Sequence, residues 1–204
     1  MSIGDNRAVV ITGASTGIGA ACALHLDQLG FAVFAGVRKS EDGVALQKSS
    51  SDRLVPVELD VTDLVTIQKS YTVVLEATRD RGLFGLINNA GIAVVAPLEA
   101  VPIADLRQQL EVNVIGQVAV TQTFLPLVRQ ARGRIINMGS IAGLSTMPLM
   151  GPYSASKFAL EAITDALRLE VQQCGIHETI IEPSAIATPI WNKSAIEAAE
   201  REAA

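Results

Sequence analysis

A tyrosine and a lysine four residues apart form the first pair in this sequence whose spacing could support chemistry. Tyr153 and Lys157 would share one face of a helix, because residues four apart are neighbours on a helix surface. A phenol can protonate an oxygen that gains negative charge, but its ordinary pKa of about 10 makes it a poor base. A neighbouring ammonium favours the phenolate, so we expect Lys157 to lower the pKa of Tyr153. Such pairs also arise by chance, and the plainer interpretation is a pair on a helix surface.

Ser140 adds a third candidate to this pair. It lies thirteen residues before Tyr153 and just after a predicted strand at residues 134–138. Its hydroxyl could bond a substrate oxygen and share the charge that develops there during a reaction. Glycines and prolines recur between Ser140 and Tyr153, which predicts an irregular loop of the kind that forms substrate pockets.

A glycine-rich segment, TGASTGIG at residues 12–19, lies between the first predicted strand and the first predicted helix. Glycine at 13, 17 and 19 suits a tight turn, close approach of the backbone to a pyrophosphate, and close contact of helix with strand. The N-terminus of the helix offers free N–H groups and partial positive charge to an anion. Three glycines alone are a weak signal, but this position favours dinucleotide binding over a plain turn.

Short β-branched runs alternate with helical patterns along the chain. We predict strands at 8–12, 32–37, 55–59, 86–88, 134–138 and around 180–181. Helices are predicted at 17–29, 62–81, 103–130 and 153–173, the second capped by Thr62. This alternation predicts an α/β fold, a single domain over 1–204 with one doubly wound parallel sheet and helices on both faces. Ligands of such a sheet bind beyond the carboxyl ends of the strands, where the candidate residues fall.

Composition excludes several other classes. With 49% apolar and 18% charged residues the chain is globular rather than disordered. A formal charge of -5 argues against a nucleic-acid partner. No apolar run reaches the ~20 residues that a membrane span needs, and the amino terminus lacks a signal pattern. Cys22 and Cys174 are too few and too distant for a disulfide framework or a metal site, and we interpret both as small core residues. We therefore expect a cytoplasmic protein without a metal.

Taken in order, these motifs resemble the short-chain dehydrogenases, whose phosphate loop reads T-G-x-x-x-G-x-G. The resemblance runs over almost the whole chain and is nearest to the retinol and hydroxysteroid dehydrogenases. It implies a Rossmann-type sheet and an enzyme that transfers hydride between NAD(P)(H) and a secondary alcohol, ketone or aldehyde. It also implies a catalytic group of Asn113, Ser140, Tyr153 and Lys157, with Tyr153 as acid and base. In this group Asn113 would distort its helix and hold a water near Lys157, which would also bind the nicotinamide ribose.

The same resemblance implies which residues contact the dinucleotide. They come from the loops after the strands and from the catalytic group: Gly13, Ser15, Thr16, Gly17, Ile18, Gly19, Arg38, Asp60, Val61, Asn89, Ala90, Gly91, Tyr153, Lys157, Pro183, Ile186 and Thr188. Asp60 would cap the adenine ring, although by itself it could equally begin the helix at Thr62. Asn88 and Asn89 would brace the sheet and line the cofactor cleft.

Arg38 follows the second strand, where an acid would select NAD by binding the ribose hydroxyls. A guanidinium there could bind a 2′-phosphate, with charge added by Lys39. We therefore predict NADP, with NAD as the alternative. The plainer interpretation is a solvated basic pair at the start of a surface loop.

Three departures from the family pattern lie near the carboxyl end. Ser184 replaces the usual glycine after Pro183, which would strain the backbone if that position had positive φ. Glu178 stands where the sixth strand should be apolar, and a buried glutamate is costly. Family members continue past Ala204, so the carboxyl end looks truncated. Residues 189–204 would only begin a substrate lid, and without the family's last strand the sixth strand would be an exposed edge.

The resemblance favours an enzyme that acts on a small hydrophobic alcohol or carbonyl substrate. It also implies a homodimer paired through the helices at 103–130 and 153–173, which carry more apolar positions than one buried face requires. A cofactor-binding but inactive scaffold or truncated fragment is the alternative, suggested by Ser184, Glu178 and the short carboxyl end. An epimerase or dehydratase of nucleotide sugars is a third option, but those relatives are longer and typically have a different glycine spacing.

Overall fold

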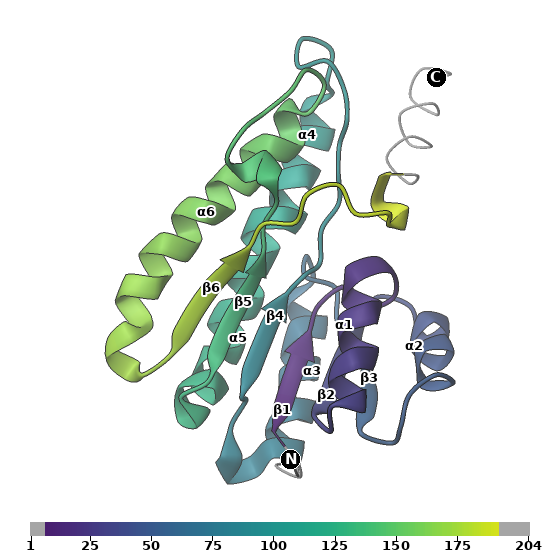
Figure 1. Ribbon diagram of the computed structural model, residues 1–204, viewed down its shortest axis with the longest axis vertical. Coiled ribbons are helices and arrows are strands. Elements are labelled where there is room, and N and C mark those ends of the chain that lie inside the picture. Colours follow the sequence, from purple (N-terminus) through teal and green to yellow (C-terminus); the bar gives the residue numbers. More distant parts are fainter. Residues whose placement is uncertain (1–6, 192–204) are drawn as a thin grey trace.

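Six parallel strands form one sheet in the computed structural model, which describes residues 7–191 (Figure 1). The strands are β1 (Ala8–Ile11), β2 (Ala32–Val37), β3 (Leu54–Glu58), β4 (Gly85–Asn88), β5 (Arg134–Met138) and β6 (His177–Ile181). They lie in the order β3-β2-β1-β4-β5-β6. The strand order therefore reverses between β1 and β4, which confirms the doubly wound prediction. Of the predicted lid, residues 192–204 lie outside the described part of the chain.

Helices cover both faces of this sheet (Figure 1). They are α1 (Gly17–Gln28), α2 (Ser40–Gln47), α3 (Leu64–Thr78), α4 (Ile103–Leu110), α5 (Gly116–Ala131) and α6 (Gly151–Val171). Because strand side chains alternate, Val10 packs with α3, α5 and α6 on one face, whereas Val9 and Ile11 pack with α1 and α2 on the other. Within residues 7–191 no helix covers the second face of β6, where Thr179 and Ile181 are exposed.

Helix α2 was not predicted, because the sequence was assigned no element between the strands at 32–37 and 55–59. Its short sequence is polar and contains Gly43, which disfavours a helix. The glycine is explained by tertiary contact, because a Cβ at Gly43 would lie 2.8 Å from Pro56 Cβ on β3. The backbone of α2 can therefore approach the sheet closely.

Two helix predictions need correction. Thr62 does not cap α3, because Asp63 is its N-cap and accepts a hydrogen bond from Val65 N at 2.8 Å. The predicted helix at 103–130 is α4 and α5 joined by a π-helical turn, Glu111–Ile115. This turn contains Asn113, so the predicted distortion of the helix at that residue is confirmed.

A chain of buried side-chain amides links the strands on the α5 and α6 side of the sheet. Asn88 Nδ2 on β4 donates to Thr121 Oγ1 at 2.8 Å and to Asn137 Oδ1 at 2.9 Å. Asn137 Nδ2 on β5 donates to Thr164 Oγ1 at 2.8 Å and to Glu178 Oε1 at 2.9 Å. Asn88 thus braces β4 against β5 and α5, as the resemblance implies, but it is buried and does not line the predicted cleft.

Glu178 ends this chain on β6 and is 4% exposed. Its second oxygen, Oε2, has no hydrogen-bond partner among the described residues. Burial raises the pKa of Glu178 to about 7, against the lowering effects of the Asn137 hydrogen bond and the Arg168 charge. A charged glutamate is therefore costly at this buried position, and the side chain favours its neutral, protonated form.

Ser184 carries no backbone strain. Among the described residues, the non-glycine positions with positive φ are Arg79, Arg132 and Leu149. Ser184 therefore does not have the positive φ that would strain a serine at this position.

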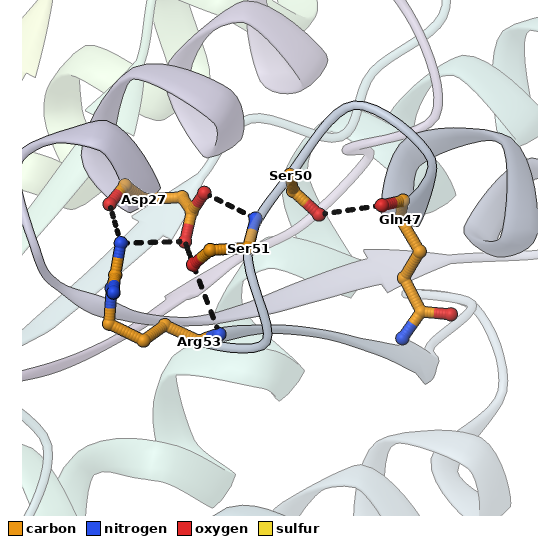
Figure 2. A network of polar contacts seen from close by, with 5 residues as sticks. All are labelled: Asp27, Gln47, Ser50, Ser51 and Arg53. Atoms are coloured by element: carbon orange, nitrogen blue, oxygen red, sulfur yellow. Dashed lines mark hydrogen bonds and ion pairs between the residues drawn. The ribbon is translucent and has the colours of Figure 1, made fainter.

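Asp27 is a second buried carboxylate, at the far end of α1 from the glycine loop (Figure 2). Its Oδ2 accepts a hydrogen bond from Ser51 N at 2.8 Å, and its Oδ1 accepts one from Ser51 Oγ. Arg53 Nη2 lies 3.8 Å from Oδ1 and donates to Asp27 O at 3.1 Å. These contacts fix α1 to the connection between α2 and β3.

Both cysteines are free and partly buried, with Cys22 packed against the α1 side of the core and Cys174 against the other. Residues 7–191 contain no group of three or more histidine, cysteine, aspartate or glutamate side chains that could hold a metal ion. In the same part of the chain no helix is both long enough and apolar enough to cross a membrane.

Candidate active site

A cavity of about 690 Å³ opens at the carboxyl ends of the strands. Its walls come from the loops after all six strands and from α4 and α6, so it lies where a doubly wound sheet binds ligands. Every residue predicted to contact the dinucleotide lines this cavity except Gly19. The sequence therefore predicts the walls of the cavity well, although Gly19 needs a different explanation.

The glycine loop is shaped by close backbone contacts. Gly13 and Gly17 adopt positive φ of 64° and 59°, which other residues reach only with strain. A Cβ at Gly13 would lie 2.8 Å from Ala90 Cα. A side chain at Gly19 would collide with Gly13 O and with Asn89 Nδ2, so this glycine allows α1 to approach the loop closely, and its contact with a dinucleotide stays a prediction.

Asn89 fixes the same loop from the neighbouring strand. Its Nδ2 donates to Thr12 O at 2.9 Å and to Gly13 O at 3.0 Å, and its own side chain lines the cavity. The N-cap of α1, Thr16, makes no side-chain cap hydrogen bond. N–H groups at the start of α1 therefore remain for an anion, which fits a pyrophosphate.

Arg38 and Asp60 lie on the walls formed after β2 and β3. Arg38 is exposed at the start of α2 and reaches the cavity, as a group for a 2′-phosphate must. Asp60 Oδ1 accepts hydrogen bonds from Thr62 N at 2.9 Å and Thr62 Oγ1 at 2.7 Å. Asp60 therefore lines the cavity and holds the turn before α3, although Asp63 rather than Asp60 begins that helix; its predicted contact with an adenine ring stays a prediction.

Ser140, Tyr153 and Lys157 meet in one wall of the cavity, each at most 9% exposed. Tyr153 lies close enough to Ser140 for the serine side chain to act on the pKa of the phenol. Burial raises the pKa of Tyr153, and Ser140 opposes this rise. Burial therefore has a larger effect on the pKa of Tyr153 than Ser140 does, and the predicted lowering by Lys157, acting with the charge of an oxidised cofactor, stays a prediction.

Lys157 is held by the backbone of β5. Its Nζ donates to Met138 O at 2.6 Å and lies 5.7 Å from the centre of the Tyr153 ring. Complete burial lowers the pKa of Lys157 to about 8, and the charge of Glu161 opposes this shift. The ammonium group is therefore charged at neutral pH but releases its proton more readily than an exposed lysine does.

Asn113 is fully buried behind this wall and does not line the cavity. Its Oδ1 accepts from Ile92 N at 2.9 Å, and its Nδ2 donates to Ile92 O at 3.0 Å and to Ser156 Oγ at 3.1 Å. The side chain of Asn113 thus holds protein groups, and its predicted role in placing a water near Lys157 stays a prediction.

Sequence reasoning missed Trp191, whose ring meets the Tyr153 ring edge-on at 5.7 Å between centres. It lines the cavity beside Ile190. Two features of the sequence could have identified Trp191, because it is the only tryptophan of the chain and lies at the start of the predicted lid. Gln109 and Ser156, buried behind Tyr153, were also missed, since neither residue type is unusual in a helix.

This fold, with a glycine loop and a serine, tyrosine and lysine in one cavity, is that of the short-chain dehydrogenases. The model of that family, described as short chain dehydrogenase, matches residues 7–199, and the chain belongs to this family. The family resemblance read from the motifs is thereby confirmed.

Three known proteins show the extent of the similarity. The 3-amino-tetrahydro-pyrrolizinone reductase of Xenorhabdus hominickii is 41% identical over 187 residues, which are 92% of this chain and 64% of that protein. Retinol dehydrogenase 5 of Homo sapiens is 40% identical over 194 residues, 95% of this chain and 61% of the relative. The chain thus spans less than two thirds of both. A crystal structure of a short chain dehydrogenase from Burkholderia cenocepacia J2315 in complex with NADP has a TM-score of 0.82 at 31% identity, covering 92% of this chain and 76% of that one.

Proposed function

We propose that this protein is an NADP-dependent oxidoreductase that interconverts an apolar alcohol and its ketone or aldehyde, with Tyr153 as acid and base. One observation carries the proposal: Ser140, Tyr153 and the buried Lys157 share a cavity with the glycine loop. A ligand long enough to reach from the N-terminus of α1 to Tyr153 would have its reactive end beside a proton donor. When bound, the dinucleotide supplies or accepts the hydride.

Tyr153, Ser140 and Lys157 have separate roles in moving the proton. Because its pKa is raised, Tyr153 holds its proton at neutral pH and is ready to give it to the oxygen of a carbonyl substrate. Ser140 can donate to the same oxygen and stabilise the charge that develops there. Lys157, charged at neutral pH and close to Tyr153, favours the phenolate left after proton transfer.

Exposed apolar side chains in the cavity wall and in the loop that follows Ser140 support a hydrophobic substrate. Ile186 and Trp191 line the cavity and are partly exposed, and the loop between Ser140 and Tyr153 exposes further large apolar side chains. Those of the loop are Ile141, Leu144, Met147 and Leu149. Their burial against a substrate would be favourable, and a charged substrate would gain nothing from them.

Replacing Tyr153 by phenylalanine tests the proposed chemistry. Tyr153→Phe should keep NADPH affinity and lower turnover by about 10²–10⁴, the usual contribution of a positioned proton donor. NADPH binding can be followed by fluorescence, and turnover with a panel of apolar ketones and alcohols. Tyr71→Phe is the matched control, because Tyr71 is the only other tyrosine and packs in the core against Phe124. A Tyr153→Phe protein with half the original turnover would refute the assignment, and NADPH binding without turnover by the unmodified chain would favour the inactive scaffold.

Arg38 tests the choice between the two dinucleotides. Arg38→Ala should weaken NADPH by about 1.5–3 kcal/mol, the value of a charge-assisted contact, and leave NADH nearly unchanged. The loss should shrink with added salt, because the contact is exposed. Lys48→Ala is the control for general loss of positive charge, because Lys48 is exposed at the other end of α2 and does not line the cavity. Equal losses for NADPH and NADH would make Arg38 a surface residue only.

A homodimer through α4, α5 and α6 belongs to the same proposal. In the single chain Val118, Leu125, Ile163 and Leu167 on these helices are only partly buried, and Leu169 is 71% exposed. A second copy placed on the same helices would cover them. Sedimentation should therefore give a dimer, and a stable monomer at micromolar concentration would contradict this expectation.

A further inference from the structure

Two side-chain amides one helical turn apart hold the segment after β4. Gln109 on α4 and Asn113 in the π-helical turn are both fully buried. Gln109 Oε1 accepts from Val94 N at 2.6 Å, and its Nε2 donates to Ile92 O at 2.9 Å. Asn113 bonds both the N–H and the carbonyl of Ile92. Together the two amides fix residues 92–94, and Ile92 and Ala93 of this segment line the cavity.

Both amides also reach the same hydroxyl on α6. Asn113 Nδ2 donates to Ser156 Oγ at 3.1 Å, and Gln109 Nε2 donates to it at 3.3 Å. Ser156 then donates its own proton to Tyr153 O at 2.7 Å. The direction of these bonds is fixed, because an amide N–H can only donate and a carbonyl can only accept. A path of hydrogen bonds thus runs from α4 to the backbone of Tyr153.

A bond from a helical serine to the preceding turn is common and by itself implies nothing beyond local structure. Thr164, on the same helix, provides the comparison. Its hydroxyl is also fully buried, bonds back to Leu160 O at 2.8 Å, and accepts an amide N–H from Asn137. The two hydroxyls differ in what they hold, because only Ser156 bonds the residue whose phenol meets Ser140.

We propose that Gln109 and Ser156 are positioning residues for Tyr153, which hold the first turn of α6 so that the Tyr153 phenol stays beside Ser140 in the cavity wall. The inference rests on the proposed function. Without the Ser156 hydroxyl, two buried N–H groups lose an acceptor and Tyr153 O loses a donor, so the first turn of α6 is free to move relative to residues 92–94. A small displacement there separates the phenol from Ser140, and small displacements are costly in catalysis.

The test compares Ser156→Ala with Thr164→Val, which removes the matched hydroxyl. Ser156→Ala should lower kcat by about tenfold or more, change KM by less than about threefold, and leave NADPH affinity within about twofold. Thr164→Val should lose a similar amount of thermal stability with kcat within about twofold. Gln109→Met keeps the size of the side chain without the amide. It should lower kcat less than Ser156→Ala, because Asn113 still donates to Ser156.

A readout without substrate separates this inference from the proposed function. In a Tyr71→Phe background Tyr153 is the only tyrosine, so its ionisation can be titrated by absorbance. Ser156→Ala should raise the pKa of Tyr153 above that of the Tyr71→Phe protein, because the lowering effect of Ser140 is weakened when the phenol moves away from it. Thr164→Val should leave it unchanged.

Equal effects of Ser156→Ala and Thr164→Val on kcat and on the titration would overturn the inference. If the unmodified chain turns over no substrate while the titration separates the two variants, the positioning holds and the proposed reaction fails.

Discussion

Each half of the fold contains a buried carboxylate, but the two carboxylates differ in how fully they are hydrogen-bonded. Asp27 and Glu178 are equally hidden, each 4% exposed. In the half built from β1 to β3, both oxygens of Asp27 accept hydrogen bonds from Ser51, and Arg53 lies beside them (Figure 2). In the half built from β4 to β6, Glu178 has one bonded oxygen and one without a partner. Burial alone therefore does not decide whether a carboxylate stabilises a fold.

The difference follows from where each carboxylate is placed. Asp27 lies near the end of α1, where the backbone N–H and the hydroxyl of Ser51, in the connection between α2 and β3, can reach its carboxylate. Glu178 lies inside a strand, whose backbone N–H groups belong to the sheet, so only a neighbouring side chain such as Asn137 can bond it. A buried carboxylate therefore finds hydrogen-bond donors more easily at the end of a helix or strand than inside one.

Removal of the Asp27 carboxylate should have the largest effect. Asp27→Ala takes both oxygens from Ser51 and leaves the Ser51 N–H without its acceptor, so unfolding free energy should fall by about 2–4 kcal/mol. Urea denaturation measures the loss. Asp165→Ala is the control, because this carboxylate is 70% exposed in an ion pair with Arg168 and its loss should cost at most about 1 kcal/mol. Equal losses would end the distinction between buried and exposed carboxylates.

Neutralising Glu178 should have the opposite sign. The native pKa of about 7 lies above the ordinary 4.5, so the native chain keeps a proton that the unfolded chain releases. Stability present below about pH 4.5 is therefore lost as the pH rises through about 7. Glu178→Gln should raise the unfolding free energy by about 1–2 kcal/mol at pH 8, an amount already reduced for solvent screening, and the gain should vanish at pH 4. A gain independent of pH would show that charge is not the cause.

Arg53 should have the smallest effect. Its side chain is 48% exposed and its charge lies 3.8 Å from Asp27 Oδ1, so Arg53→Ala should cost about 0.5–1 kcal/mol, and less at high salt. The same denaturation series measures it. A loss as large as that of Asp27→Ala would mean that Arg53, not Ser51, satisfies the carboxylate.

Periodicity predicted the parts of this fold that local sequence decides. The strands at 32–37 and 134–138 agree with β2 and β5, because β-branched runs bounded by turns leave little choice. The residues of the cavity walls were predicted from the family resemblance, and the topology explains why they meet, because the carboxyl ends of parallel strands lie at one edge of the sheet. The sequence does not separate the roles of the loop glycines, because a glycine needed for helix contact looks the same as one needed for a phosphate.

Several features of the structure could not be predicted, because they depend on contacts between residues that are far apart in the sequence. The π-helical turn at Asn113 exists because the amide bonds Ile92, which is 21 residues away. The partner of Glu178 is Asn137 on another strand, and no local pattern links them. The raised pKa of Tyr153 also depends on burial, which the spacing of Tyr153 and Lys157 does not reveal.

The position of β1 beside both β2 and β4 has a consequence for synthesis on the ribosome. The first three strands can pair as soon as β3 has emerged, but the other edge of β1 must wait for β4. At roughly 5–20 residues per second, the α3 segment between them takes a few seconds to make. During that time an open strand edge could pair with a neighbouring nascent chain. β1 is four residues long, which keeps the unpaired edge short until its own partner arrives.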